Sequence, residues 1–456
     1  MDFLQLLNSI DGFIWGPPLL VLLVGTGIYF TIRLGLIQIV KLPKALKLIF
    51  KAENNGSGDI SSFGALCTAL AATIGTGNIV GVATAIKAGG PGALFWMWLA
   101  AFFGMATKYS EGLLAIKFRS KDSNGQISGG PMYYIVNGMG QKGKPLAVFF
   151  AVSGILVALL GIGTFSQVNS ITEAVNSSFG IDVRIVAVVL AVLVALVVFG
   201  GLQSISNVAT KVVPFMTVVY IAICLTILVG SYNLIPQTFA LIFKSAFTGQ
   251  AAAGGFLGAT VSMAIRNGIA RGVFSNESGL GSAPIAAAAA KTEWPAEQGL
   301  ISMTGTFIDS IIICTLTGVS LIITGVWQGE LNGAIMTQAA FASVLPTVGP
   351  LFLTVSLSLF AFTTILGWSY YGERCFEFLF GAKKINIFRC LFVVMVLLGA
   401  FLKLEMVWVI ADIVNGLMAI PNLIALLALS PVVISETKLY MDHLQSLDKS
   451  QNKKIS

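Results

Sequence analysis

The sequence is poor in the residues that carry most enzyme chemistry. Its single histidine, His443, lies in a polar C-terminal tail. A histidine-based metal site and a catalytic triad are therefore excluded. The cysteines show no C-x-x-C spacing and are odd in number, which indicates small core residues instead of disulfides. They are Cys67, Cys224, Cys314, Cys375 and Cys390. We expect no enzyme activity and no organic cofactor.

Charged residues are scarce as well. They make up 10% of the 456 residues, hydrophobic residues make up 56%, and the mean hydropathy is +0.88. These values lie outside the range of soluble globular proteins and predict an all-α polytopic membrane protein. Apolar runs of membrane-spanning length recur along the chain, and we expect about eleven transmembrane helices. Their centres lie near Leu22, Ile74, Phe103, Val157, Leu193, Ile223, Val261, Ile313, Phe360, Val394 and Leu423.

Lysine and arginine are divided unevenly between alternate loops. All but four of the 27 fall in one set of loops, which by the positive-inside rule is cytoplasmic. We therefore expect the N-terminus outside, the C-terminus in the cytoplasm, and no nucleic-acid partner behind the basic composition. The set comprises residues 33–60, 105–145, 200–214, 264–298, 371–390 and the tail from 435. The four exceptions are Lys87, Arg184, Lys244 and Lys403.

The run from Ile60 to Lys87 is long enough to cross the bilayer, but residues 72–78 at its centre read ATIGTGN. Opened backbone at this depth leaves unpaired N–H and C=O groups, which is costly unless protein, water, ion or substrate binds them. A helix broken at mid-membrane is typical of a binding site. The alternative interpretation is that Gly75 and Gly77 only allow a neighbouring helix to pack closely.

A second interruption is expected between Gly254 and Ala290. This stretch, GGFLGATVSMAIRNGIARGVFSNESGLGSAPIAAAAA, contains too many glycines for one regular helix. Ser275 and Asn276 are suitable N-cap residues for a helix that restarts near Glu277. The sequence places the break only between residues 266 and 281.

The two interruptions fall in the second and seventh spans, five spans apart. Because five is odd, the segment after the second break runs in the opposite orientation to the segment after the first. Two such helices are typical of an inverted-repeat transporter whose site lies where the breaks meet. We expect residues 1–59 to hold an extra N-terminal helix and a basic amphipathic segment. Two five-helix repeats follow, 60–233 and 234–434, and then a polar tail, 435–456.

Other polar residues lie inside predicted spans. Gln167 is either a hydrogen-bonding link between helices or a substrate contact. Asp309 is a carboxylate within the membrane and a candidate coupling residue. Thr363 and Thr364 either bond to their own helix or present hydroxyls to a small cation. Trp368, one turn beyond Thr364, is positioned to close the site.

Four motifs resemble the alanine or glycine:cation symporter family, also called sodium:alanine symporters. They are ATIGTGN (72–78), GGPGALFWMWLAAFFG (89–104), RGVFSNESGLGSAPIAAAAAKT (271–292) and LGWSYYGE (366–373). The resemblance covers nearly the whole chain. It implies the leucine-transporter fold of two inverted five-helix repeats, and sodium-coupled uptake of alanine or glycine across a prokaryotic cell membrane.

The resemblance also implies site residues. The substrate set is Ile74, Gly75, Thr76, Gly77, Asn78, Gln167, Phe274, Asn276, Thr364 and Trp368. Amides near Gly77 and Asn78 would bind the carboxylate, and the side chains of Gln167 and Asn276 the ammonium. Sodium would bind the carbonyls of Ala71 and Ile74 and the hydroxyls of Thr363 and Thr364. Two positions depart from the family pattern, Val80 in place of alanine and Ala287 in place of a histidine.

Several alternatives stay open at the level of sequence. A proton-coupled transporter or exchanger on the same fold would use Asp309 as the titrating group. A channel would need a continuous polar pore, and a transporter-like sensor would need an appended signalling domain. The oligomeric state and the preference between L- and D-alanine do not follow from the sequence.

Overall fold

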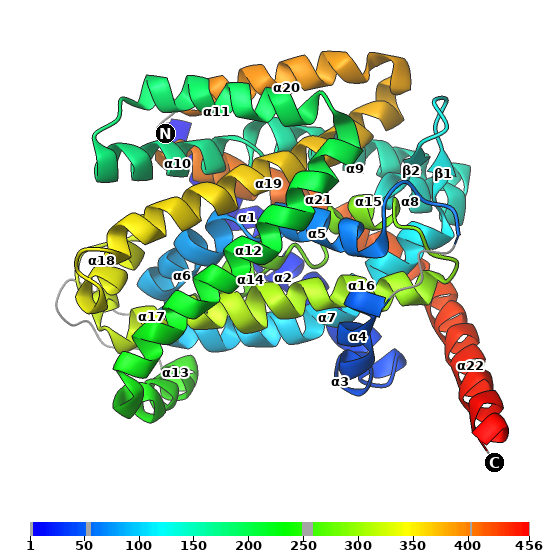
Figure 1. Ribbon diagram of the computed structural model, residues 1–456, viewed down its shortest axis with the longest axis horizontal. Helices are drawn as coiled ribbons and strands as arrows, with labels where there is room; N and C mark the ends of the chain where they lie inside the picture. The colour runs from blue at the N-terminus through cyan, green and yellow to red at the C-terminus, as the bar shows by residue number, and fades with distance from the viewer. Residues whose placement is uncertain (1–2, 52–55, 249–258, 402–403, 456) are drawn as a thin grey trace.

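Helices form almost all of the structure. The computed structural model describes residues 3–51, 56–248, 259–401 and 404–455 (Figure 1). Its strands in these residues are one short antiparallel hairpin, β1 (Ser120–Lys121) and β2 (Ile127–Ser128). The mostly helical architecture agrees with the fold class expected from composition.

The helices follow one another along the chain with short connections. The first half contains α1 (Phe3–Ile14), α2 (Pro17–Arg33), α3 (Ile37–Val40), α4 (Leu42–Lys51), α5 (Ser62–Thr73), η1 (Gly77–Gly81), α6 (Val82–Gly89), α7 (Gly92–Lys117), α8 (Pro131–Met139), η2 (Gln141–Gly143), α9 (Lys144–Leu160), α10 (Phe165–Phe179), α11 (Val183–Val198) and α12 (Gly201–Gly230). The second half contains η3 (Tyr232–Leu234), α13 (Ile235–Thr248), α14 (Val261–Asn276), α15 (Ala283–Ala287), α16 (Pro295–Thr306), η4 (Phe307–Cys314), α17 (Thr315–Ile323), η5 (Val326–Gln328), α18 (Gly333–Val344), α19 (Gly349–Phe380), η6 (Ala382–Lys384), α20 (Ile385–Gly399), α21 (Leu404–Ala428) and α22 (Ser430–Ile455).

Six helices of the described residues are long and apolar enough to cross a membrane, and one bent pair qualifies as a seventh crossing. The expected count of eleven is not confirmed by this measure. α11 has 16 residues and α20 has 15, fewer than the roughly 20 that a full crossing needs. The six are Leu4–Arg33, Gln141–Phe179, Gly201–Gly230, Pro295–Ile323, Gly349–Phe380 and Trp408–Ala428.

The interruption predicted in the second span is confirmed. α5 starts at the N-cap Ser61, whose side chain accepts a hydrogen bond from the Gly64 N–H, and it ends at Thr73. The chain resumes at Gly77 as one turn of π-helix, η1, and continues into α6. The two halves are bent by 51°. The break therefore lies at residues 74–76, inside the predicted motif.

The second interruption is present, but its capping differs from the expectation. Ser275 and Asn276 do not start a helix, because α14 continues through both. The helix ends where Glu277 adopts a left-handed conformation with φ of 56° and its N–H bonds to the Val273 carbonyl. α15 restarts at Ala283 with Pro284 in its first turn, where a missing N–H costs nothing. Residues 254–258 of the predicted stretch lie outside the described residues.

The two broken helices pack together and against α7. α14 contacts α6 and lies along α7, which also lies along α16 (Figure 1). Glycines allow the close approach: a Cβ at Gly268 of α14 would overlap the Ala93 carbonyl and lie 2.8 Å from the Trp96 Cβ on α7. On the other side, α19 contacts both α5 and α10. The breaks are thus enclosed by α7 on one side and α19 on the other.

Arg119, just after α7, binds several backbone carbonyls at the end of the molecule where α5 begins. Its guanidinium donates to the carbonyls of Ser57, Ala288, Ala290 and Thr292 at 2.6–3.2 Å. A parallel bridge pairs Ile60 with Ala290 at the same place. The start of the first broken helix and the end of the second are therefore fastened to each other.

Several basic residues that the charge count assigns to loops lie in helices instead, and three of them are next to the broken helices or within them. Lys108 lies inside α7 and is 2% exposed. Arg266 and Arg271 lie in α14, where they form ion pairs with Asp11 at 3.9 Å and with Asp412 at 2.7 Å. The predicted loops include these residues because a single charge within an apolar run usually marks the end of a span. Here the charges lie inside helices, since each has a partner within the protein.

The packing of α14 on α7 gives a stability prediction. Gly268→Ala should destabilise the detergent-solubilised protein by about 1–3 kcal/mol, because the added methyl group overpacks the contact with Ala93 and Trp96. The measurement is thermal unfolding followed by tryptophan fluorescence. Gly25→Ala is the matched control, since a Cβ there meets nothing within 4 Å. Equal melting temperatures for the two variants would contradict the prediction.

Candidate functional site

Backbone groups exposed by the first break are bound by side chains from three elements. The Gly75 N–H donates to Asn78 Oδ1 at 3.0 Å, and the Thr76 N–H donates to Gln167 Oε1 on α10 at 3.3 Å. The Ile74 carbonyl accepts from Thr364 Oγ1 on α19 at 3.4 Å. The structure thus brings together residues that the sequence predicted for the site.

The glycines of the break leave room for these contacts. A Cβ at Gly75 would overlap Thr364 Oγ1 and lie 3.3 Å from Gln167 Oε1. A Cβ at Gly77 would lie 2.9 Å from the Cα of Ser275 on α14. Neighbouring helices therefore approach the opened backbone more closely than they could if residue 75 or 77 carried a side chain. The close-packing interpretation of the glycines is confirmed, and the binding-site interpretation stays a prediction.

Two polar atoms at the break are buried without a partner among the described residues. They are Gln167 Nε2 and Thr76 Oγ1, on residues that are 0% exposed. A buried unpaired donor is costly, so the pair is suited to a polar ligand. Because Gln167 Oε1 already accepts the Thr76 N–H, its free group is the NH₂ donor. This geometry suits a ligand carboxylate and not the ammonium that the sequence had suggested.

Asp309 joins the two broken helices. It lies in the π-helix η4, and its Oδ1 accepts from Asn78 Nδ2 in the first break at 2.7 Å. Its Oδ2 accepts from Ser275 Oγ on α14 at 2.9 Å and from Ser310 Oγ at 2.8 Å. The carboxylate is fully buried, so these donors replace its hydration. One buried carboxylate therefore contacts a residue from each of the two broken helices.

Two predicted residues point elsewhere. Thr363 Oγ1 bonds to the Phe360 carbonyl at 2.9 Å and faces Met216 Sδ at 3.7 Å. Asn276 Nδ2 donates to Ser310 Oγ on η4 at 2.9 Å. Thr364 Oγ1 also donates to the Phe360 carbonyl of its own helix, at 3.0 Å, but it additionally lies 3.4 Å from the Ile74 carbonyl of the first break. Asn276 is engaged with the next helix.

Backbone groups at the second break are bound by two charged residues of α7. Lys108 Nζ donates to the Asn276 carbonyl at 2.8 Å, at the C-terminal end of α14. Glu111 Oε1 accepts from the N–H groups of Gly279 and Gly281, each at 3.1 Å. A cation at the helix carbonyl end and an anion at the free amides are the favourable pairings. Lys108 and Glu111, three residues apart on one helix, therefore bracket the second break.

Glu277, within that break, is also fully buried. Its Oε1 accepts from the indole N–H of Trp368 on α19 at 2.9 Å, and its Oε2 accepts from Ser282 Oγ at 2.5 Å. The second break is therefore tied to α7 through its backbone and to α19 through this side chain.

The space around the breaks differs between the two ends. Beyond α6, α10 and α18 lies a vestibule of about 530 Å³, lined by Val80, Thr84, Ser170, Glu173, Arg271, Glu330 and Trp408 among others. Phe274 contacts two residues that line it: its ring is tilted by 35° against that of Trp408, with centroids 5.4 Å apart, and the Arg271 guanidinium lies 5.5 Å from its centroid. Arg271 is in turn held by Asp412 through two hydrogen bonds of 2.7 and 2.9 Å.

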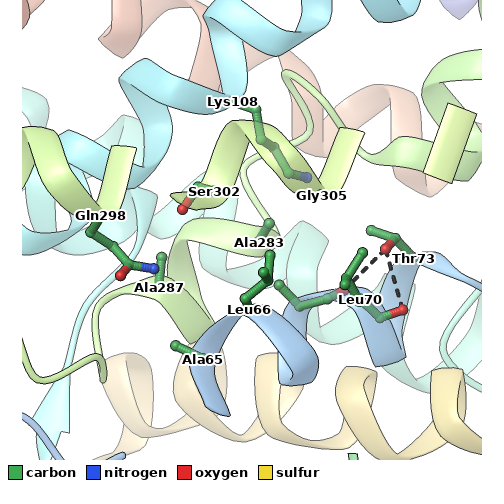
Figure 2. Close-up of a pocket in the computed structure, with 11 residues that line it drawn as sticks. Ala65, Leu66, Leu70, Thr73, Lys108, Ala283, Ala287, Gln298, Ser302 and Gly305 are labelled. Carbon is green, nitrogen blue, oxygen red and sulfur yellow. Dashed lines mark hydrogen bonds between the residues drawn. The ribbon is translucent and has the colours of Figure 1, made fainter. Parts of the chain in front are cut away.

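The space at the other end is narrow. Between α5, α7, α15 and α16 lies a cavity of only about 10 Å³, into which Lys108 points from α7 (Figure 2). That volume is at the limit of one water molecule. Ala287 lines this cavity, so the position noted for its missing histidine lies beside Lys108. On this side Arg119 also lines a separate pocket of about 550 Å³, so what distinguishes this end is the narrow space beside Lys108 and not a lack of pockets.

Comparison with known proteins identifies the family. The model of the sodium:alanine symporter family matches residues 1–454. The chain belongs to this family. It is similar to the sodium/alanine symporter AgcS of Methanococcus maripaludis, with 54% identity over 96% of this chain and 98% of the relative. It is also similar to an uncharacterized transporter of Haemophilus influenzae, with 57% identity over 98% of both chains.

Solved structures support the fold. The crystal structure of MhsT in complex with L-phenylalanine superposes with a TM-score of 0.56 at 14% identity, over 84% of this chain and 99% of that one. At that identity the likeness shows the fold alone, which is the leucine-transporter fold that the resemblance implied. The protein is a multi-pass membrane transporter of the sodium:alanine symporter family and not an enzyme.

Within this symporter-family chain, sequence reasoning missed Lys108, Glu111 and Glu277. Lys108 was counted as a loop residue, and Glu111 and Glu277 received no role. A signal was available: a Lys-x-x-Glu pair on one face of a helix that is otherwise apolar is expected only where both charges are paired. The partners themselves are not predictable, because they are backbone groups of a break whose position the sequence left open.

Gly75 provides a direct test of the first break. Gly75→Ala should reduce labelled alanine uptake into proteoliposomes by at least about tenfold, since the methyl group displaces Thr364 or Gln167 from the opened backbone. Gly81→Ala is the control in the same helix, because the nearest atom to a Cβ there is 4.0 Å away. Both variants should be present in the membrane at wild-type levels. Full activity of Gly75→Ala would show that the close contacts are not needed.

Proposed function

We propose that the protein is a sodium-coupled symporter of small neutral amino acids, alanine and glycine, working by alternating access. The observation that carries the proposal is the first break, where the Thr76 N–H bonds to Gln167 Oε1 while Gln167 Nε2 and Thr76 Oγ1 are both buried without a partner among the described residues. Membership of the sodium:alanine symporter family supports the sodium and amino-acid parts. The name of the Methanococcus maripaludis relative supports alanine.

The substrate carboxylate would bind the free NH₂ of Gln167 and the hydroxyl of Thr76. These donors are held at the N-terminal end of η1 and α6, whose helix dipole also favours a negative charge. The substrate ammonium would then face carbonyl oxygens of the break. Together these groups would bind both charged ends of a zwitterion, and the fully buried Trp368 and Phe274 would limit its side chain to the size of that in alanine or glycine.

The cation would bind between the two repeats. Thr364 Oγ1 lies 3.4 Å from the Ile74 carbonyl, so a hard cation between them would gain two oxygen ligands from separate elements. The Ala71 carbonyl and the Thr363 hydroxyl complete the predicted set, although Thr363 would have to turn away from Met216. Binding here stabilises the arrangement in which α5 and α19 are close, which is the differential affinity that coupling requires.

Alternating access is supported by the difference between the two ends. The vestibule reaches Arg271 and Trp408, which contact Phe274, whereas Arg119 and the Ile60–Ala290 bridge fasten the two broken helices to each other at the opposite end. For transport, the fastened end must open while the Phe274 side closes. We further propose eleven membrane crossings in two inverted repeats, 60–233 and 234–434, in a prokaryotic cell membrane, with the N-terminus outside and the tail 435–456 in the cytoplasm.

Proton coupling is the second candidate. Asp309 is buried, bonds to both broken helices and carries a carboxylate that a proton could neutralise. The deciding experiment is uptake of labelled alanine and glycine into proteoliposomes under an imposed sodium gradient, with sodium replaced by choline in one arm and a proton gradient in another. Uptake driven by sodium supports symport with sodium. Uptake driven only by the proton gradient would overturn it.

Thr364 should control the cation dependence. Thr364→Ala should raise the half-saturating sodium concentration for alanine uptake by at least about tenfold, equivalent to roughly 1.4 kcal/mol, because one cation ligand is lost. Thr364→Ser should restore most of the sodium affinity, since the hydroxyl is retained. Thr363→Ala should have the smaller effect of the two alanine variants, because its hydroxyl faces Met216. An unchanged sodium requirement in Thr364→Ala would remove Thr364 from the cation site.

Trp368 and Phe274 should limit the size of the substrate. Both are fully or almost fully buried beside the breaks. Trp368→Ala should therefore admit larger side chains, with leucine competing for alanine uptake at least about tenfold better than in the wild type. Competition is measured against labelled alanine at fixed sodium. Leucine competing as well as alanine in the wild type would contradict this role.

A further inference from the structure

One hydrogen bond fixes the orientation of the Trp368 indole. The side chain is fully buried on α19, one turn beyond Thr364, which contacts the first break. Its ring nitrogen donates to Glu277 Oε1 at 2.9 Å. Its face meets Tyr371 edge-on at 5.3 Å, a contact that does not by itself prevent the ring from tilting.

The Glu277 side chain is itself fixed by hydrogen bonds to both of its carboxylate oxygens. Its second carboxylate oxygen accepts from Ser282 Oγ at 2.5 Å, so each oxygen has a donor. Its φ of 56° is in the left-handed region, where glycine would be the unstrained residue. A glutamate at such a position, fully buried, needs a compensating role for its side chain.

The segment that carries Glu277 is also fixed. Lys108 binds the carbonyl of the preceding residue, Asn276, and Glu111 binds the N–H groups of Gly279 and Gly281. α7 therefore holds the backbone on both sides of Glu277, and the Glu277 carboxylate in turn holds the Trp368 indole on α19.

We propose that Glu277 is a positioning residue for substrate size, which acts by holding the Trp368 indole against the substrate site. The inference rests on the proposed transport of small neutral amino acids. Glu277 need not contact the substrate. Its effect is on how far the indole can move aside for a longer side chain, so removing it changes selectivity and not only rate.

The test compares two variants of Glu277. Glu277→Gln keeps an oxygen acceptor for the indole, and Glu277→Gly removes the side chain while relieving the positive φ. Thermal unfolding of both purified variants checks that they fold. The measurement is the ratio of kcat/KM for leucine to that for alanine in proteoliposomes. Glu277→Gly should raise this ratio about tenfold, and Glu277→Gln should leave it near the wild-type value.

A second background separates positioning from general structural damage. In Trp368→Phe, which lacks the N–H, adding Glu277→Gly should produce no further rise in the ratio. A ratio unchanged by Glu277→Gly, with both substrates slowed equally, would overturn the proposal. So would a full additional rise in the Trp368→Phe background.

A binding measurement tests the role of Glu277 separately from the proposed sodium-coupled transport. Leucine and alanine binding are also measured by thermal shift of the purified variants, which requires no gradient. Wild-type alanine uptake that ignores sodium would overturn sodium symport, while the binding ratio would still decide whether Glu277 acts through Trp368.

Discussion

A peptide group opened inside a membrane must find a partner, and this requirement organises the whole site. Two helices of the chain stop within the protein interior, after Thr73 and after Asn276. Each stop frees carbonyl and N–H groups that lipid cannot satisfy. The helices that surround the breaks, α7, α10, α19 and η4, supply side chains for those groups. Their polar residues serve the breaks more directly than they serve their own helices.

The two breaks meet the requirement in different ways. The second is bound by the protein alone, with Lys108 at its carbonyl end and Glu111 at its amide end. The first leaves two side-chain atoms, Gln167 Nε2 and Thr76 Oγ1, without partners among the described residues, and at the second Glu111 Oε2 is likewise unpaired. The unpaired atoms of the first break differ in kind, because they are an NH₂ donor and a hydroxyl. This difference supports the proposal that the substrate binds at the first break.

The sequence predicted the first break closely, because glycines, threonines and an asparagine at the centre of an apolar helix favour an opened backbone. It located the second only within an interval and misjudged its capping, since Ser275 and Asn276 favour helix starts in general but here belong to a helix that Glu277 ends. The roles of Lys108 and Glu111 could not be predicted from the sequence, because their partners are backbone groups of a break whose position was not known. Composition was enough to predict a membrane protein. The number of spans was harder to predict, because some helices, such as α11, are short and others, such as α7, carry charged residues.

Arg119 gathers carbonyl oxygens from the segment before α5 and from the segment after α15 under one guanidinium. The same two segments also meet directly, because the Lys291 N–H donates to the Ile60 carbonyl and the Asp59 N–H donates to the Ala289 carbonyl, each at 2.8 Å. Separating the segments therefore breaks backbone bonds as well as the Arg119 contacts, and loss of the arginine alone would leave part of the fastening in place.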